Sequence, residues 1–162
     1  AYYKSDFAYG IAVDTGGKIV VVGGTGGGCV PPNCFSEYKV AVARYNADGS
    51  LDTSFGSSGI QTGGTGFARR VAIQSDGKVV VVGKQDSIRI IVNRFTVNGL
   101  LDTSFSADGV IEEDVNVGTH VHFYWSEGYD LVLQPDGKIV VVGFVCTGVN
   151  GVNSDILLLR YR

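Results

Sequence analysis

One stretch of sequence occurs three times and decides the fold. It reads GIAVDTGGKIVVVG at residues 10–23, RVAIQSDGKVVVVG at residues 70–83 and DLVLQPDGKIVVVG at residues 130–143. The copies align without a gap and start sixty residues apart. An internal repeat of this kind predicts a structure made of similar units that stack on one another.

Each copy has the pattern of two β-strands joined by a tight turn. Val71 and Ile73 alternate with other residues, which is the two-residue period of a strand. Asp76-Gly77 follows, matched by Asp136-Gly137 and Gly16-Gly17, and such dipeptides favour a two-residue hairpin turn. The β-branched run after the turn is apolar at every position, which indicates a central strand that is buried on both faces.

A second signature follows the first. The sequence VARYNADGSLDTSFGSSGI at residues 42–60 recurs as VNRFTVNGLLDTSFSADGV at residues 92–110, and LLRYR at residues 158–162 matches part of it. It predicts a third strand, a second turn, and a short strand near Ile60 or Val110. About four strands per unit follow, and no stretch has a helical period long enough to compete.

Sheets that are apolar on both faces must stack on neighbouring sheets, as the blades of a β-propeller do. We therefore predict an all-β fold in which residues 1–162 form a single repeat domain of three four-stranded antiparallel blades. The blades are expected at about residues 1–46, 59–96 and 109–162. Propellers typically have about four to eight blades, so three blades predict an open or oligomer-completed propeller.

The paired signatures Q-x-DGK followed by VVVG, and RY-N-x-DGSLDTSFG, resemble the delta-sixty repeat, a β-propeller repeat of secreted and cell-surface bacterial proteins. The resemblance covers nearly the whole chain, and two separate signatures recur in the same order. It implies a blade fold and an extracellular setting, but no particular chemistry. The chain departs from the pattern by having three copies and by ending inside the third.

Composition limits the partners and the compartment. The net charge is −3 and the sequence has no basic stripe, which argues against a nucleic-acid partner. No apolar run approaches the roughly 18 residues needed to cross a bilayer. The chain starts at Ala1 and has no methionine, so we expect a mature, processed chain or a fragment of a longer one. A secreted origin is the simplest explanation, which predicts an extracellular or cell-surface location.

The two ends predict self-association, because apolar faces and free strand edges attract other chains. Two chains could close a ring, or head-to-tail contacts could build a filament. Tyr2, Tyr3 and Phe7 either add a strand to a neighbouring chain or form the outer strand of their own first blade. At the other end, the expected assembly residues are Leu157, Leu159 and Tyr161.

Two insertions interrupt the repeat and are candidate sites. Cys29 and Cys34 bracket one short segment and favour a disulfide, with free thiols or metal ligands as alternatives. Cys146 is expected to be a buried small apolar residue, unless it pairs with another chain. The other insertion predicts a glycan or protein site, a two-histidine metal site, or simply a polar strand and packing against the third blade. Its candidate residues are His120, His122, Phe123, Tyr124 and Trp125.

The polar motifs of the repeat suggest structural roles. Residues 46–52 have oxygen-bearing side chains at alternate positions, as a calcium loop does, but turn chemistry explains them equally well. We predict no metal and no cofactor. The recurring arginines at 44, 94 and 160, with Asp52 and Asp102, predict Arg–Asp pairs that tie blades together.

No serine, cysteine or threonine in the sequence pairs with an evident base, so we predict that the chain is not an enzyme. The leading hypothesis is a non-enzymatic extracellular structural protein, a propeller-like protomer that associates through its open blade edges into a fibre or a closed oligomer. One alternative is a cell-surface binding module that recognises a glycan or protein through residues 119–127. Another is a fragment of a larger propeller.

Overall fold

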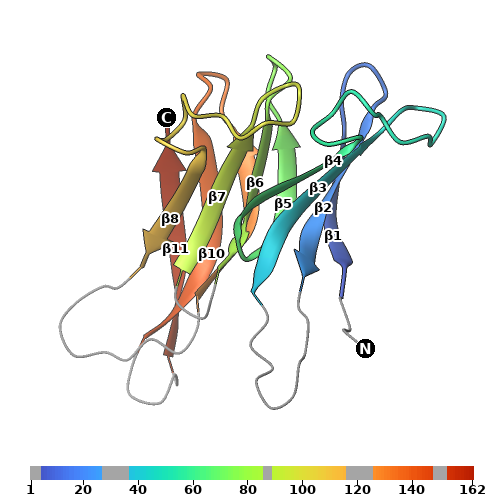
Figure 1. Cartoon of the computed structure of the whole chain (residues 1–162). Coiled ribbons are helices and arrows are strands. Elements are labelled where there is room, and N and C mark those ends of the chain that lie inside the picture. The colour runs from blue at the N-terminus through green and yellow to red at the C-terminus, as the bar shows by residue number, and fades with distance from the viewer. Residues whose placement is uncertain (1–4, 27–36, 86–88, 116–125, 148–152) are drawn as a thin grey trace, which may run out of the picture.

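The computed structural model describes residues 5–26, 37–85, 89–115, 126–147 and 153–162. These residues form three antiparallel sheets, which stand side by side with their faces in contact (Figure 1). None of them forms a helix long and apolar enough to span a bilayer. The strands are β1 (Phe7–Val13), β2 (Ile19–Gly26), β3 (Tyr38–Tyr45), β4 (Ile60–Thr65), β5 (Phe67–Ile73), β6 (Val79–Lys84), β7 (Arg89–Phe95), β8 (Val110–Asp114), β9 (Ser126–Leu133), β10 (Ile139–Thr147) and β11 (Asn153–Tyr161).

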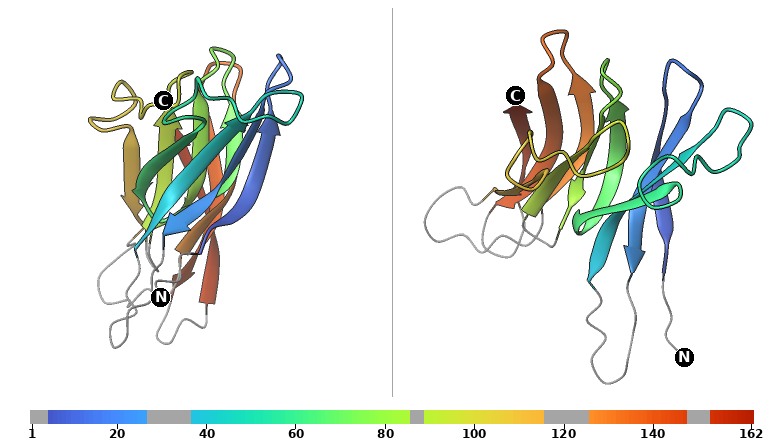
Figure 2. Two further views of the ribbon diagram at one scale, coloured as in Figure 1. Left: turned by 45° about the vertical axis from the view of Figure 1, so that its right-hand side comes forward. Right: turned by 45° about the horizontal axis from the view of Figure 1, so that its top comes forward.

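Each sheet is one blade. Blade 1 has the strand order β1-β2-β3-β4, blade 2 has β5-β6-β7-β8, and blade 3 has β11-β10-β9. The first strands of the blades lie beside one another, β1 next to β5 and β5 next to β9, and the blades fan outward from them (Figure 2). The predicted all-β architecture of three antiparallel sheets is confirmed. The third sheet has three strands among the described residues, against four in each of the others.

The blade boundaries fall one strand later than the sequence suggested. Strand β4 pairs with β3, with Lys39 opposite Thr65 and Ala43 opposite Ile60, so it closes blade 1. The sequence had placed this strand in blade 2. Only Gly66 separates β4 from β5, and its φ of +119° turns the chain from the outer edge of one blade to the inner strand of the next. Strand β8 closes blade 2 on β7 in the same way.

The hairpin turn is longer than predicted. Between β5 and β6 the amide of Gly77 donates to the carbonyl of Gln74 over 2.9 Å, and the Gln74 amide donates to the Lys78 carbonyl over 2.8 Å. Within this turn only Gly77 has a positive φ, +82°. This is a three-residue loop that ends in a glycine bulge, rather than a two-residue turn with two positive φ angles. The carboxylate of Asp76 accepts the Lys78 amide and stabilises the turn.

The core lies between the blades. In β6, Val79 and Val81 pack toward blade 1, whereas Val80 and Val82 pack toward blade 3, and all four are buried. This confirms that the apolar run forms a central strand buried on both faces. In blade 1 only one face of β2 belongs to a core cluster, the face that carries Val20 and Val22.

The blades are also joined by the connector that follows the third strand. Phe55 in the connector of blade 1 is fully buried, and the amide of Gly56 donates to the carbonyl of Asn98 in blade 2 over 2.7 Å. A Cβ on Gly99 would lie 2.6 Å from the Gly56 nitrogen. The matching residue of blade 1, Gly49, has the same left-handed backbone but open space where its Cβ would be.

Substituting these two glycines distinguishes two causes of lost stability. One is backbone strain, and the other is lost contact between the blades. Gly49→Ala should destabilise the protein by about 1 kcal/mol, because only the left-handed conformation is penalised. Gly99→Ala should cost roughly 3 kcal/mol, because the added methyl also pushes the connector off blade 2. Urea denaturation of both variants measures the difference. Equal losses would show that the connector contact contributes little.

Candidate functional site

A polar cluster recurs at the same place in blades 1 and 2. The Arg44 Nε donates to the Asp52 carboxylate over 2.7 Å, and the Lys18 ammonium lies 2.5 Å from the same oxygen. In blade 2, Arg94 lies 2.7 Å from Asp102. Both aspartates are buried. The predicted Arg–Asp pairs are therefore present, and each pair ties the connector to the third strand of its own blade.

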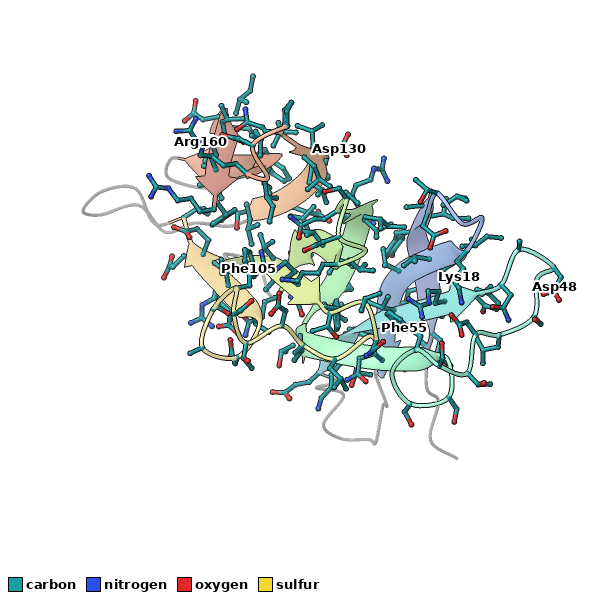
Figure 3. All side chains as sticks on the ribbon, turned by 90° about the horizontal axis from the view of Figure 1, so that it is seen from above. Lys18, Asp48, Phe55, Phe105, Asp130 and Arg160 are labelled. Carbon is teal, nitrogen blue, oxygen red and sulfur yellow. The ribbon has the colours of Figure 1, made fainter. Side chains whose placement is uncertain are left out.

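The link to the next blade comes from the other side of the arginine. The Arg44 Nη1 donates to the backbone carbonyl of Val97, in the second turn of blade 2, over 2.7 Å. Its guanidinium also lies over the Phe55 ring, 4.5 Å from the centroid. Seen from above, Phe55 lies between blades 1 and 2, Phe105 lies at blade 2 on the side of blade 3, and Arg160 projects from the far blade (Figure 3). Arg160 is exposed.

The clusters keep their aspartates ionised. Hydrogen bonds from Lys18 and then Ser54 hold the pKa of Asp52 well below its usual range. For Asp102, burial favours the protonated form, but hydrogen bonds from Ser104 and Lys78 outweigh it and its pKa is also depressed. A carboxylate that is charged and paired in this way stabilises the folded chain.

The segment that resembled a calcium loop is a turn whose oxygens are already engaged. The Asp48 carboxylate accepts both the amide and the hydroxyl of Ser50. The Asp52 carboxylate accepts Arg44, Lys18 and Ser54. Within the part of the chain that the structure describes, no group of three or more side chains is arranged to hold a metal ion.

A second chain of contacts runs across the inner strands of all three blades. The Arg69 guanidinium of blade 2 stacks over the ring of Tyr9 in blade 1, 4.2 Å from the centroid. The same side chain forms an ion pair with Glu127 of blade 3, which is almost fully buried. Phe67 packs against the guanidinium from within blade 2. Because Glu127 lies inside the sequence insertion, no repeat signal pointed to this link.

Blade 3 has one apolar face that no other part of the described structure covers. Ile156 and Leu158 on β11 are 87% and 70% exposed, and Val132 on β9 is 60% exposed. Val142 on β10 lies between these strands and is also exposed. Four large apolar side chains on one face form a patch of the kind that marks a protein interaction site.

The assembly residues predicted from the sequence are the alternate residues of the same strand. Leu157, Leu159 and Tyr161 point to the other face of β11 and pack in the core between blades 2 and 3. Since side chains alternate along a strand, these three residues are covered by blade 2 while Ile156 and Leu158 are open. Burial also raises the pKa of Tyr161 far above its usual value, assisted by the nearby Glu113.

Blade 1, at the other end of the row, also has a face that no other described part of the chain covers. A largely apolar hollow of about 440 Å³ lies against it, lined among others by Val21, Ala41, Ala43 and Ile60. Asp6 and Thr25 lie at its edge and share a hydrogen bond of 2.6 Å. Ile11 and Val13 on β1 are exposed. The open faces of blades 1 and 3 are the candidate functional site.

Of the remaining candidate residues, the structure describes Phe7 and Cys146, and Phe7 is among the residues that line the hollow of blade 1. Phe7 belongs to β1, opposite Gly24, and its ring packs against Phe67, so it is a strand residue of its own blade. Cys146 is a free, half-buried thiol, with its sulfur 3.7 Å from the Ser154 hydroxyl. Several candidates lie outside the described residues: Tyr2, Tyr3, Cys29, Cys34, His120, His122, Phe123, Tyr124 and Trp125.

Stacked antiparallel blades with a repeated connector define a β-propeller repeat protein. The sequence profile of DUF5122, a β-propeller domain of unknown function, matches residues 33–55, 74–105 and 134–162. These segments cover slightly more than half of the chain, and the chain belongs to this family. Among curated proteins, no match to the chain is found.

The Arg–Asp clusters predict a stability that depends on pH. The folded pKa values of Asp52 and Asp102 lie below the ordinary value of 3.8, so their contribution is present above about pH 4 and is lost as the pH falls below it. Asp52→Asn should lower the free energy of unfolding at pH 7 by about 2 kcal/mol and flatten its fall in acid. Urea titrations between neutral and acid pH measure both effects.

Asp130→Asn is the matched control. This carboxylate is exposed and lies 3.7 Å from the equally exposed Arg70, so its replacement should change stability by less than about 0.5 kcal/mol. An Asp52→Asn variant as stable as this control would show that the buried cluster does not stabilise the blade.

Proposed function

We propose that this protein is a non-enzymatic extracellular structural protein, whose chains associate through the open faces of their end blades into a fibre or a closed oligomer. The observation that carries the proposal is the pair of uncovered apolar faces, one on blade 1 and one on blade 3. Within the chain, each blade face that meets another blade contributes buried apolar side chains to a core cluster. An end face of the same composition is stabilised when another blade covers it.

The free edge of β11 supports the same proposal. In blades 1 and 2 the third strand pairs with an outer strand, β4 or β8. In blade 3 no outer strand is present beside β11 among the described residues. An open edge offers unpaired amides and carbonyls to an added strand.

The sequence offers a candidate for that added strand. Residues 1–4 stand sixty positions before residues 61–64, which belong to the outer strand β4. Tyr2 and Tyr3 are therefore the sequence counterparts of outer-strand residues of a preceding blade. This keeps open the proposal that they complete the sheet of a neighbouring chain.

The extracellular setting rests on sequence resemblance. The two signatures of the chain resemble the delta-sixty repeat, which occurs in secreted and cell-surface bacterial proteins. Fractionation of the native producing cells, with detection of the chain at the surface or in the medium, tests this location directly.

Self-association is tested on the 162-residue chain by sedimentation velocity and negative-stain microscopy. The wild-type chain should form oligomers or filaments that grow with concentration. Leu158→Lys should weaken association at least tenfold, because it places a charge on the open apolar face of blade 3.

Leu100→Lys is the matched control for that variant. Leu100 is also an exposed leucine, but it lies in a turn and not on a blade face. Its replacement should leave association unchanged. A wild-type chain that stays monomeric over the whole concentration range contradicts the proposed function.

A further inference from the structure

We infer that the partner of each open face is the opposite open face of a second copy of this chain, so that copies join head to tail. The open face of blade 3 in one copy packs on the open face of blade 1 in the next. The pairing reproduces the register of the two blade interfaces inside the chain. This inference rests on the proposed self-association and adds its direction, its register and a specific polar contact.

The first argument comes from equivalent positions in the repeat. The residues of each blade that face the next blade occupy the same positions: Val20, Val22, Val40 and Val42 in blade 1, and Val80, Val82, Ile90 and Val92 in blade 2. All eight are buried. The same positions of blade 3 hold Val140, Val142, Ile156 and Leu158, the residues of its open face.

The opposite face of each blade follows the same rule. Toward the preceding blade, blade 2 presents Val81 and Ile91, and blade 3 presents Val141 and Leu157. The matching residues of blade 1 are Val21 and Ala41, which line its hollow. We call the face that a blade turns toward the next blade its forward face, and the face that it turns toward the preceding blade its backward face. Each interface in the chain therefore joins a forward face to a backward face. Blade 3 leaves a forward face open and blade 1 leaves a backward face open, so only head-to-tail contact repeats the observed interface.

The second argument is the fit of side-chain sizes. On the open forward face, Leu158 stands where blades 1 and 2 have the smaller Val42 and Val92. Ile156 is larger than Val40 of blade 1 and matches Ile90 of blade 2. On the open backward face, small residues stand where blades 2 and 3 have larger ones: Ala41 in place of Ile91 and Leu157, and Ala43 in place of Asn93 and Leu159.

These differences compensate one another. The side chains that protrude further from blade 3 meet a face that is hollowed by two alanines. A hollow of about 440 Å³ gives room for an isoleucine and a leucine to insert. Neither open face pairs as well with a copy of itself, since two protruding faces or two hollow faces would meet.

The third argument is a polar contact that the repeat prescribes. Arg44 of blade 1 reaches forward to the carbonyl of Val97 in blade 2. The counterpart of Arg44 in blade 3 is Arg160, which is exposed, and the counterpart of Val97 in blade 1 is Ala47, which is also exposed. In the head-to-tail pair, the Arg160 guanidinium donates to the Ala47 carbonyl of the next copy.

The direction of association is tested by mixing two blocked variants. Leu158→Lys blocks the forward face, and Ala43→Lys places a lysine in the hollow of the backward face. Each variant alone should sediment as a folded monomer. An equimolar mixture should form a 1:1 heterodimer with the affinity of the wild-type contact, because each pair retains one intact forward face and one intact backward face.

Other results separate the direction from the proposed function. Dimers of the Leu158→Lys chain alone would mean that two blade 1 faces pair, and dimers of the Ala43→Lys chain alone would mean that two blade 3 faces pair. Either result overturns the head-to-tail inference and leaves self-association standing. A wild-type chain that never associates overturns both. If either variant fails to fold by circular dichroism, Val142→Lys and Ile11→Lys block the same two faces.

The polar contact has its own test. Arg160→Ala should weaken association of the wild-type background about tenfold, the usual effect of losing one hydrogen bond from a charged donor. Arg162→Ala, which removes an exposed arginine two residues away, should leave it unchanged. Equal effects of the two variants would show that net charge, and not the contact to Ala47, is what matters.

Discussion

The structure depends on one constraint: a sheet whose central strand is apolar on both faces must be covered on both sides. Four consecutive valines, residues 79–82, fill β6 and alternate between two cores. Blade 2 meets the constraint because a blade lies on each side of it. Blades 1 and 3 are built from the same run of residues, but the described residues cover each of them on one side only. The apolar character that stabilises the middle of the row therefore creates the two open faces.

Polar contacts set how the blades align, because apolar contact alone has no direction. The Arg44–Asp52 pair holds the connector against its own blade, and the same arginine reaches the Val97 carbonyl of the next. Arg69 adds a second alignment near the inner strands through Tyr9 and Glu127. Both links join particular atoms of adjacent blades, so a shift of one blade along another would break charge-assisted hydrogen bonds. The blade interface thus has a defined register.

The periodicity of the sequence predicted the stacked sheets, but it did not predict the turn length or the blade boundaries. The sixty-residue repeat and the valine run led to stacked antiparallel sheets with a central buried strand. The turn was misjudged because a dipeptide ending in glycine suits both two-residue and three-residue loops, and only the hydrogen bonds between Gln74 and Lys78 distinguish them. The blade boundary was predicted wrongly because the strand near Ile60 is separated from β5 by Gly66 alone, whereas its actual partner β3 ends at Tyr45, before the connector.

The sequence also failed to predict which face of β11 is exposed. The run Ile156-Leu157-Leu158-Leu159 has no polar residue to mark the exposed side, so hydrophobicity alone assigns no face. Alignment on the repeated arginine does assign one, since Arg160 corresponds to Arg44 and thereby matches Ile156 and Leu158 to Val40 and Val42.

The same alignment separates ordinary repeat positions from specialised ones. If the end faces were simply unused copies of an inner interface, their side chains should vary independently of one another. Instead the forward face is enlarged at Leu158, where blades 1 and 2 have valines, and the backward face is reduced at Ala41 and Ala43. A larger residue in a packed interface is tolerated only where its neighbours give up volume, so enlargement on one face and reduction on the other favour the two faces having been shaped against each other. Within one chain, blade 2 separates these two faces, so packing inside the chain does not account for the reciprocity.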